Sequence, residues 1–147
     1  MKSRYLRGSV WHSLPAKEGI SFVYEGSDTF TVVRNPYDRV LSAYYYDNRH
    51  EQNDYFNRST LNDYILNRIK PNWTARPQST YTHDENGHKI IDRVIRFERL
   101  DVDFPRLMKR YNLNVALPSR PLNVRRSKAK MGVKHMSKKA LQFLNDF

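Results

Sequence analysis

The side chains best suited to chemistry lie in one short segment, Arg34 to Tyr44 (RNPYDRVLSAY). Arg34 carries a permanent charge, and its guanidinium can grip a phosphate through two parallel hydrogen bonds. Ser42 lies two helical turns into the expected helix and can add a hydroxyl donor to the same phosphate. Arg39, one turn earlier on roughly the same face, either completes the site or pairs with a carboxylate. The spacing therefore predicts a site for a phosphate-like anion.

A strand and a helix must position these residues. Asp28 to Arg34 (DTFTVVR) is a run of β-branched and aromatic residues, typical of a buried strand. Asn35 suits an N-cap and Pro36 the first helical position, so we expect a helix that begins here and ends near Asp47. Backbone amides at a helix start that follows a strand attract anions in α/β sheets, and we expect them to contribute to the site.

Two further segments follow this helix. Ser59 or Thr60 is expected to cap a second helix, which Pro71 ends. The segment from Tyr81 to Ile91 is predicted as two extended pieces, with Asp84 to Gly87 as the turn between them.

The remaining elements are predicted from similar patterns. Ile90 to Phe97 is expected to form a strand, and a helix capped by Asp101 or Asp103 should run to about Tyr111. Ser137 to Phe147 is predicted as a terminal helix. Strands that alternate with helices imply a mainly parallel sheet, so the expected fold class is α/β.

Length and charge limit the possibilities further. A chain of 147 residues is expected to form one domain, 1–147, around one core. Its 26 Lys and Arg against 15 Asp and Glu give a formal charge of +11, which favours polyanionic partners such as nucleotides, nucleic acids or acidic glycans. A basic C-terminal segment, 104–147, has no Asp or Glu from Phe104 to Asn145 but eleven Lys or Arg. Both an anion-binding face and a solvated surface fit this run.

The absence of cysteine excludes disulfides, thiolate nucleophiles and cysteine-ligated zinc. His50, His83, His88 and His135 are not spaced as metal ligands, and no metal is expected. No stretch approaches the roughly 18 to 20 apolar residues that a membrane span requires, and Met1 to Gly8 lacks the apolar run of a secretion signal. As written, the chain is expected to be cytoplasmic.

The segment from Arg34 to Tyr44 resembles the 3′-phosphate-binding motif of sulfotransferases, R-[ND]-P-x-x-R-x-x-S-x-Y, at every fixed position. The resemblance implies that Arg34 and Ser42, with Arg39 as a further candidate, bind the 3′-phosphate of 3′-phosphoadenosine 5′-phosphosulfate (PAPS), the sulfuryl donor. A second segment, Arg76 to Gln78 followed by Asp92 to Leu100 (DRVIRFERL), is similar to Golgi-type carbohydrate sulfotransferases.

This family resemblance implies a three-layer α/β fold of the P-loop nucleotide-kinase-like type. The implied reaction is transfer of a sulfuryl group from PAPS to a hydroxyl of a carbohydrate, without a metal. If the chain is a fragment of a longer eukaryotic enzyme, the resemblance implies a Golgi or membrane-associated location.

Sulfuryl transfer to an alcohol requires a base that accepts the hydroxyl proton. His12 stands ahead of the phosphate-binding strand, where some glycan sulfotransferases carry a catalytic histidine, and imidazole titrates near neutrality. Glu98 is the rival base, and an ordinary surface or capping role for His12 stays open. Arg125 and Arg126 lie where the family has a loop that closes over the nucleotide, so they are candidates for contact with the 3′-phosphate or with a sulfated glycan.

One feature of complete sulfotransferases, a P-loop-like segment that holds the 5′-phosphosulfate, has no counterpart in the sequence. Met1 to Val10 contains Gly8 and Ser9 but no Lys-x-Gly-x-[ST]-[ST] pattern. Three explanations are open: the chain is a fragment of a longer enzyme, another basic segment such as Lys2, Arg4 or Arg7 substitutes, or catalysis has been lost.

Two other functions remain as alternatives. A noncatalytic nucleic-acid-binding protein would explain the acid-free basic segment, but it leaves the pattern from Arg34 to Tyr44 without a role. A degenerate relative would bind the nucleotide and transfer nothing.

Overall fold

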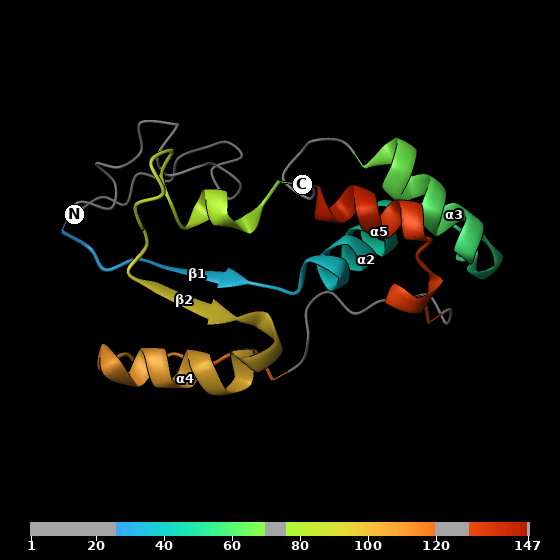
Figure 1. Ribbon diagram of the computed structural model, residues 1–147. Coiled ribbons are helices and arrows are strands. Elements are labelled where there is room, and N and C mark those ends of the chain that lie inside the picture. Colours follow the sequence, from blue (N-terminus) through green and yellow to red (C-terminus); the bar gives the residue numbers. More distant parts are fainter. Residues whose placement is uncertain (1–25, 70–75, 120–129, 147) are drawn as a thin grey trace. The chain divides into compact units, whose positions relative to one another are not determined.

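The computed structural model describes residues 26–69, 76–119 and 130–146 (Figure 1). Its strands and longer helices are β1 (Phe30–Val33), α2 (Pro36–Asp47), α3 (Arg58–Asp63), β2 (Arg93–Arg96), α4 (Leu100–Arg110) and α5 (Lys138–Asn145). Single turns of 3-10 helix occupy Asn53–Tyr55, Gln78–Tyr81, Phe97–Arg99 and Val133–His135, and Tyr64–Arg68 is a π-helical turn. None of the helices in the described part of the chain has the length and apolarity to cross a bilayer.

The chain divides into two compact units. One consists of Met1–Thr31 with Pro77–Val94, and the other of Val32–Arg76 with Ile95–Phe147. The strand–helix junction at Asn35 belongs to the second unit, which also contains both apolar clusters.

The two strands pair in a parallel sheet, and α2 and α3 lie between them in the chain (Figure 1). Parallel neighbours need such a crossover connection. The predicted α/β class with a parallel sheet is confirmed. Both strands are shorter than the predicted ranges, Asp28 to Arg34 and Ile90 to Phe97, and at Phe97 the chain turns into a 3-10 helix.

A carboxylate holds each end of the strand pair. Before the strands, Asp92 Oδ2 accepts hydrogen bonds from the backbone N–H and the hydroxyl of Thr29, both at 2.8 Å. After the strands, Glu98 Oε1 accepts the backbone N–H of Asn35 at 2.6 Å. These contacts satisfy amides at the two ends of β1, where the ladder stops.

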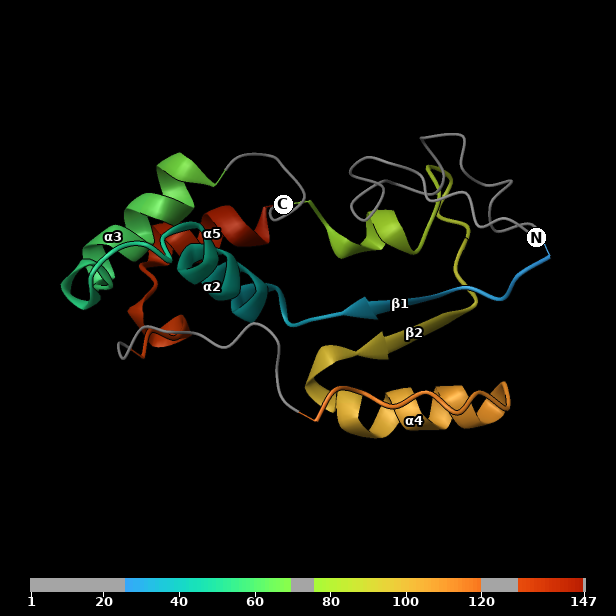
Figure 2. The ribbon, with the colours of Figure 1, turned by 180° about the vertical axis from the view of Figure 1, so that it is seen from behind.

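The larger apolar cluster joins α2, α3 and α5, which lie side by side in both views (Figures 1 and 2). Tyr44 is fully buried at its centre. Its ring packs on the rings of Tyr45, Phe56 and Tyr64 at centroid distances of 5.4, 5.6 and 5.4 Å. Its hydroxyl has a partner in Thr60 Oγ1 at 2.7 Å, so burial leaves no unsatisfied polar atom there.

The smaller cluster joins β2 to α4. Ile95 packs with Leu107 and Met108, which the helical spacing places on the inner face of α4. This packing holds the strand that ends beside Phe97 and Glu98.

Local capping explains where the helices begin. Asn35 caps α2 by accepting hydrogen bonds from the N–H groups of Tyr37 and Asp38, and α2 ends at Asp47, as predicted. Ser137, the first residue of the predicted terminal helix, is instead the cap of α5, because its side chain accepts the N–H of Ala140.

Two predicted caps are wrong. The cap of α3 is Asn57, not Ser59 or Thr60, because Thr60 stands at the third helical position, where its Oγ1 accepts the backbone N–H of Asn57 in a capping box. The cap position of α4 is Arg99, because the 3-10 turn Phe97–Arg99 leads directly into the helix. Asp101 and Asp103 lie in its first turn, where carboxylates favour the positive end of the helix dipole.

In the first unit, the predicted turn at Asp84 to Gly87 is present. Asp84 Oδ1 accepts the N–H groups of Asn86 and His88, and Gly87 has a φ of +79°, which glycine adopts without steric cost. The flanking extended pieces are reduced to a single antiparallel bridge, His83 to Lys89.

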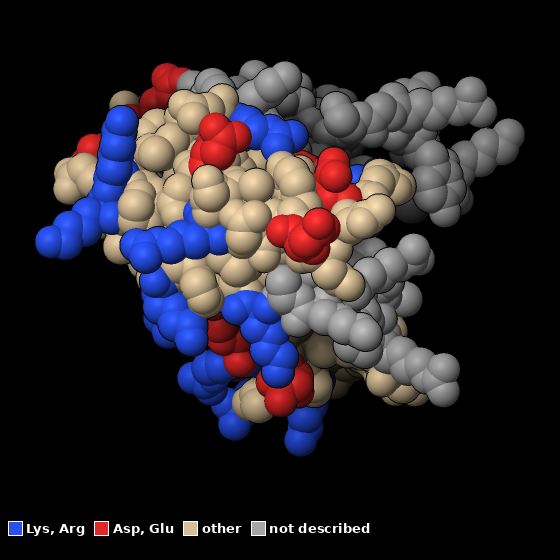
Figure 3. Space-filling view, turned by 90° about the vertical axis from the view of Figure 1, so that its right-hand side faces the viewer, with Lys and Arg blue, Asp and Glu red and all other residues tan. Residues whose placement is uncertain are grey.

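On the face drawn in Figure 3, Asp and Glu side chains (red) lie among the Lys and Arg side chains (blue). Of the basic residues in the acid-free run that the structure describes, Arg106 lies on α4, Lys134 in the 3-10 turn Val133–His135 and Lys138 on α5.

We predict that Leu61→Ala destabilises the protein by about 2–5 kcal/mol, because a large-to-small change in a packed core loses burial and leaves a cavity. Leu61 is 0% exposed in the larger cluster, whereas Leu113 is 52% exposed. Leu113→Ala is therefore the matched control and should change the free energy of unfolding by well under half as much. Urea unfolding followed by circular dichroism measures both, and equal losses would contradict the assigned core.

Candidate functional site

The candidate site lies at the junction of β1 and α2. Arg34 directly follows β1, and α2 begins two residues later with Asn35 between them. Arg39 and Ser42 are three positions apart on α2 and so lie on neighbouring parts of one helical face. Ser42 is exposed, while Arg34 and Arg39 are half-buried. The predicted strand–helix junction is present; the convergence of Arg34 and Ser42 on one anion stays a prediction.

The backbone amides at the start of α2 already have acceptors within the chain. The N–H groups of Tyr37 and Asp38 donate to Asn35 Oδ1 at 3.0 and 3.4 Å, and that of Asn35 donates to Glu98. Pro36 has no N–H, and the N–H of Arg39 makes the first intrahelical bond, to Asn35 O at 2.9 Å. Two side chains of the protein therefore accept the hydrogen bonds of these amides, and the contribution of the amides to anion binding stays a prediction.

The guanidinium of Arg34 lies over the ring of Phe97, with 4.5 Å between Cζ and the ring centroid. This distance is within the range of a cation–π contact. Phe97 begins the 3-10 turn that follows β2. The contact brings together the two sequence segments that resemble one family, and the sequence analysis did not pair them. The available clue was that both residues follow parallel strands, whose carboxyl ends meet at one edge of a sheet.

Glu98 is held as an ionised carboxylate. The hydrogen bond from Asn35 N–H lowers the pKa of Glu98 below its ordinary value, and its own backbone N–H and the charges of Arg34 and Arg96 act in the same direction. A carboxylate with a lowered pKa holds a proton less readily, which weakens it as a general base at neutral pH. The geometry therefore favours a structural role for Glu98.

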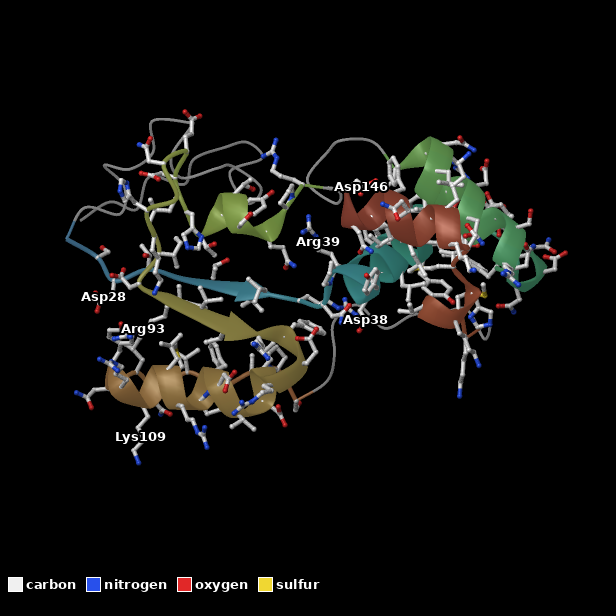
Figure 4. The ribbon with its side chains drawn as sticks, in the orientation of Figure 1. Asp28, Asp38, Arg39, Arg93, Lys109 and Asp146 are labelled. Atoms are coloured by element: carbon white, nitrogen blue, oxygen red, sulfur yellow. The ribbon has the colours of Figure 1, made fainter. Side chains whose placement is uncertain are left out.

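Arg39 reaches a different segment of the same unit. Its Nη1 donates to the backbone carbonyl of Arg76 at 3.0 Å, which ties the beginning of the Arg76 to Gln78 segment to α2. Figure 4 shows Arg39 and Asp38 leaving the first turn of α2 in different directions. This hydrogen bond tests neither of the two predicted roles of Arg39. The contribution of Arg39 to anion binding therefore stays a prediction.

Three predicted site residues, His12, Arg125 and Arg126, lie outside the described residues, as does the segment from Met1 to Val10. Their assignments stay predictions. Within residues 26–69, 76–119 and 130–146, no cluster of three or more His, Asp or Glu side chains is arranged to hold a metal ion.

Comparison with known proteins gives one match. The family model described as "Sulfotransferase family" matches residues 8–146. Comparisons with curated proteins and with solved structures found no match. The matched range contains the junction at Asn35 and the turn Phe97–Arg99.

We predict that Glu98→Gln reduces the loss of stability in acid. The folded pKa of Glu98 lies below its ordinary value of 4.5, so the stabilisation by the carboxylate is complete above that value and is lost as the pH falls through the folded pKa. Between about pH 5 and pH 3, the free energy of unfolding should therefore fall more steeply in the wild type than in the variant.

Urea unfolding at a series of pH values measures this difference. Glu51→Gln, which removes an exposed carboxylate from the loop after α2, controls for the change in net charge. Identical acid profiles for the two variants would show that the contact with Asn35 does not hold Glu98 in its ionised form.

Proposed function

The chain belongs to the sulfotransferase family, and we propose that it binds PAPS through the junction at Asn35 and transfers the sulfuryl group to a hydroxyl of a carbohydrate. The observation that carries the proposal is that the complete R-[ND]-P-x-x-R-x-x-S-x-Y pattern stands at a parallel strand–helix junction. Ligands of α/β sheets collect at such carboxyl ends of strands. The three-layer, nucleotide-kinase-like arrangement is part of the same proposal.

In this proposal, side chains alone supply the donors to the 3′-phosphate. Arg34 provides a charged fork that suits two oxygens of one phosphate, and Ser42 provides a hydroxyl from the exposed face of α2. Arg39 adds positive charge nearby, and Arg125 and Arg126 are proposed to contact the 3′-phosphate or a sulfated glycan. Because the amides at the helix start are engaged, the affinity should depend strongly on Arg34.

The proposed reaction balances as a transfer between two oxygens. The acceptor hydroxyl oxygen attacks sulfur, and the bond between sulfur and the bridging oxygen of the 5′-phosphate breaks. The products are the sulfate ester and adenosine 3′,5′-bisphosphate. The hydroxyl proton passes to a base, for which we propose His12, because Glu98 is held as a weakly basic carboxylate.

A noncatalytic nucleic-acid-binding function is the second candidate, and exposed basic residues on α4 favour it. Arg106, Lys109 and Arg110 lie at helical spacing on the outer side of this helix. A protein of this kind would respond to long polyanions with a steep salt dependence. It would not discriminate among small adenine nucleotides by their phosphates.

We predict that Arg34→Ala weakens the binding of adenosine 3′,5′-bisphosphate about 10- to 100-fold, the effect of losing charge-assisted hydrogen bonds to a phosphate. Titration calorimetry measures the dissociation constant. Arg58→Ala removes the same charge from an exposed position at the start of α3 and is the matched control. It should leave the dissociation constant nearly unchanged.

Two results would contradict the proposal. One is equal weakening by Arg34→Ala and Arg58→Ala, which indicates nonspecific attraction of anions. The other is the absence of saturable bisphosphate binding together with salt-sensitive binding of single-stranded nucleic acid. If binding is present, a single-turnover assay with labelled PAPS and a desulfated glycosaminoglycan separates an enzyme from a binding-only relative.

A further inference from the structure

We infer that Phe97 and Glu98 are positioning residues for Arg34, and that their turn makes the site selective for nucleotides that carry a 3′-phosphate. The inference rests on the proposed function, because it names residues that prepare the same phosphate site. In this inference, neither Phe97 nor Glu98 contacts the nucleotide. Each acts through the Arg34–Asn35 junction, one on a side chain and the other on the backbone.

Phe97 acts on the side chain of Arg34. The guanidinium lies 4.5 Å from the ring centroid, and the ring is 48% exposed. A guanidinium carries five N–H donors in a rigid plane, and contact with a ring draws on its charge. The ring therefore restricts the orientation of the Arg34 side chain. A long side chain that is ordered in advance loses less conformational entropy when the ligand binds.

Glu98 acts on the backbone next to Arg34. Its Oε1 accepts the N–H of Asn35 at 2.6 Å, and the side chain of Asn35 caps the helix that carries Ser42. One hydrogen bond thus links the turn after β2 both to the end of β1 and to the start of α2. In the sequence, the two predicted phosphate donors, Arg34 and Ser42, lie on either side of Asn35, which this hydrogen bond holds.

The charge of Glu98 and its hydrogen bond have opposite effects on an anion. A carboxylate near Arg34 opposes phosphate binding, whereas the hydrogen bond to Asn35 aligns the junction that favours it. Two substitutions separate these effects. Glu98→Gln and Glu98→Ala both remove the charge, but only glutamine retains an oxygen that can accept the N–H of Asn35.

The experiment is titration calorimetry of the full chain with adenosine 3′,5′-bisphosphate and with adenosine 5′-monophosphate, which lacks the 3′-phosphate. Phe97→Leu should weaken bisphosphate binding about threefold, the size of an exposed cation–π contact, and Phe97→Tyr should restore it. Glu98→Ala should bind bisphosphate about fivefold more weakly than Glu98→Gln, the effect of one hydrogen bond. Binding of the monophosphate should change in none of these variants.

The chain offers a matched control for the ring. Arg49 lies over Tyr46 at 4.6 Å, and Tyr46 is 55% exposed, so this pair resembles Arg34 and Phe97 in geometry and exposure. It stands at the far end of α2 from the junction. Tyr46→Leu should leave the binding of both nucleotides unchanged.

The outcomes are distinguishable. The positioning role is overturned if Phe97→Leu binds bisphosphate like the wild type and Glu98→Ala binds it like Glu98→Gln. It is also overturned if these variants weaken the binding of both nucleotides equally. In either case, Arg34→Ala still tests the proposed function. If the wild type does not bind bisphosphate, or Arg34→Ala binds it equally well, both proposals fail. Should Phe97→Leu not fold, as judged by circular dichroism, the comparison of Glu98→Gln with Glu98→Ala decides.

Discussion

A carboxylate at the end of one strand holds the start of the helix that follows the neighbouring strand. Glu98 accepts the backbone N–H of Asn35 at 2.6 Å across 63 positions of sequence. The contact is possible because β1 and β2 are parallel, so that the segments after both strands emerge at the same edge of the sheet. Asp92 and Thr29 make the corresponding contact before the strands, again across 63 positions. The two contacts lie before and after the paired residues and so define the register of β1 against β2.

This construction changes how an anion can be recognised at the junction. Helix starts commonly bind phosphate through free N–H groups and the helix dipole. Here the side chains of Asn35 and Glu98 accept the hydrogen bonds of those groups, and the proposed site therefore relies on the charge and planar geometry of the Arg34 guanidinium. The ring of Phe97 then matters because a long, mobile arginine needs orientation before it can act as a specific donor. A site of this kind depends on side-chain order more than on backbone geometry.

Local rules predicted the elements that depend on neighbouring residues. The start of α2 followed from Asn35 and Pro36, and α5 begins one residue after its predicted start at Ser137. The caps of α3 and α4 were missed, because several polar residues compete near each start and the 3-10 turn before α4 leaves no trace in composition.

The contacts of the candidate site were harder to predict, for a different reason. The cation–π contact of Arg34 with Phe97 and the hydrogen bond from Asn35 to Glu98 both depend on the register of two strands that are far apart in the chain. A single sequence does not reveal that register. The same limit explains why Glu98 was weighed as a base: its basicity depends on a donor 63 positions away. The family match covers the segment from Arg34 to Tyr44, and the roles of its individual residues stay predictions.

A crystal structure of the protein with adenosine 3′,5′-bisphosphate tests this account most directly. The account predicts that the 3′-phosphate lies within hydrogen-bonding distance of both the Arg34 guanidinium and the Ser42 hydroxyl, while Asn35 N–H remains bonded to Glu98. A 3′-phosphate bound by the amides of Tyr37 and Asp38, or held without either Arg34 or Ser42, would contradict it.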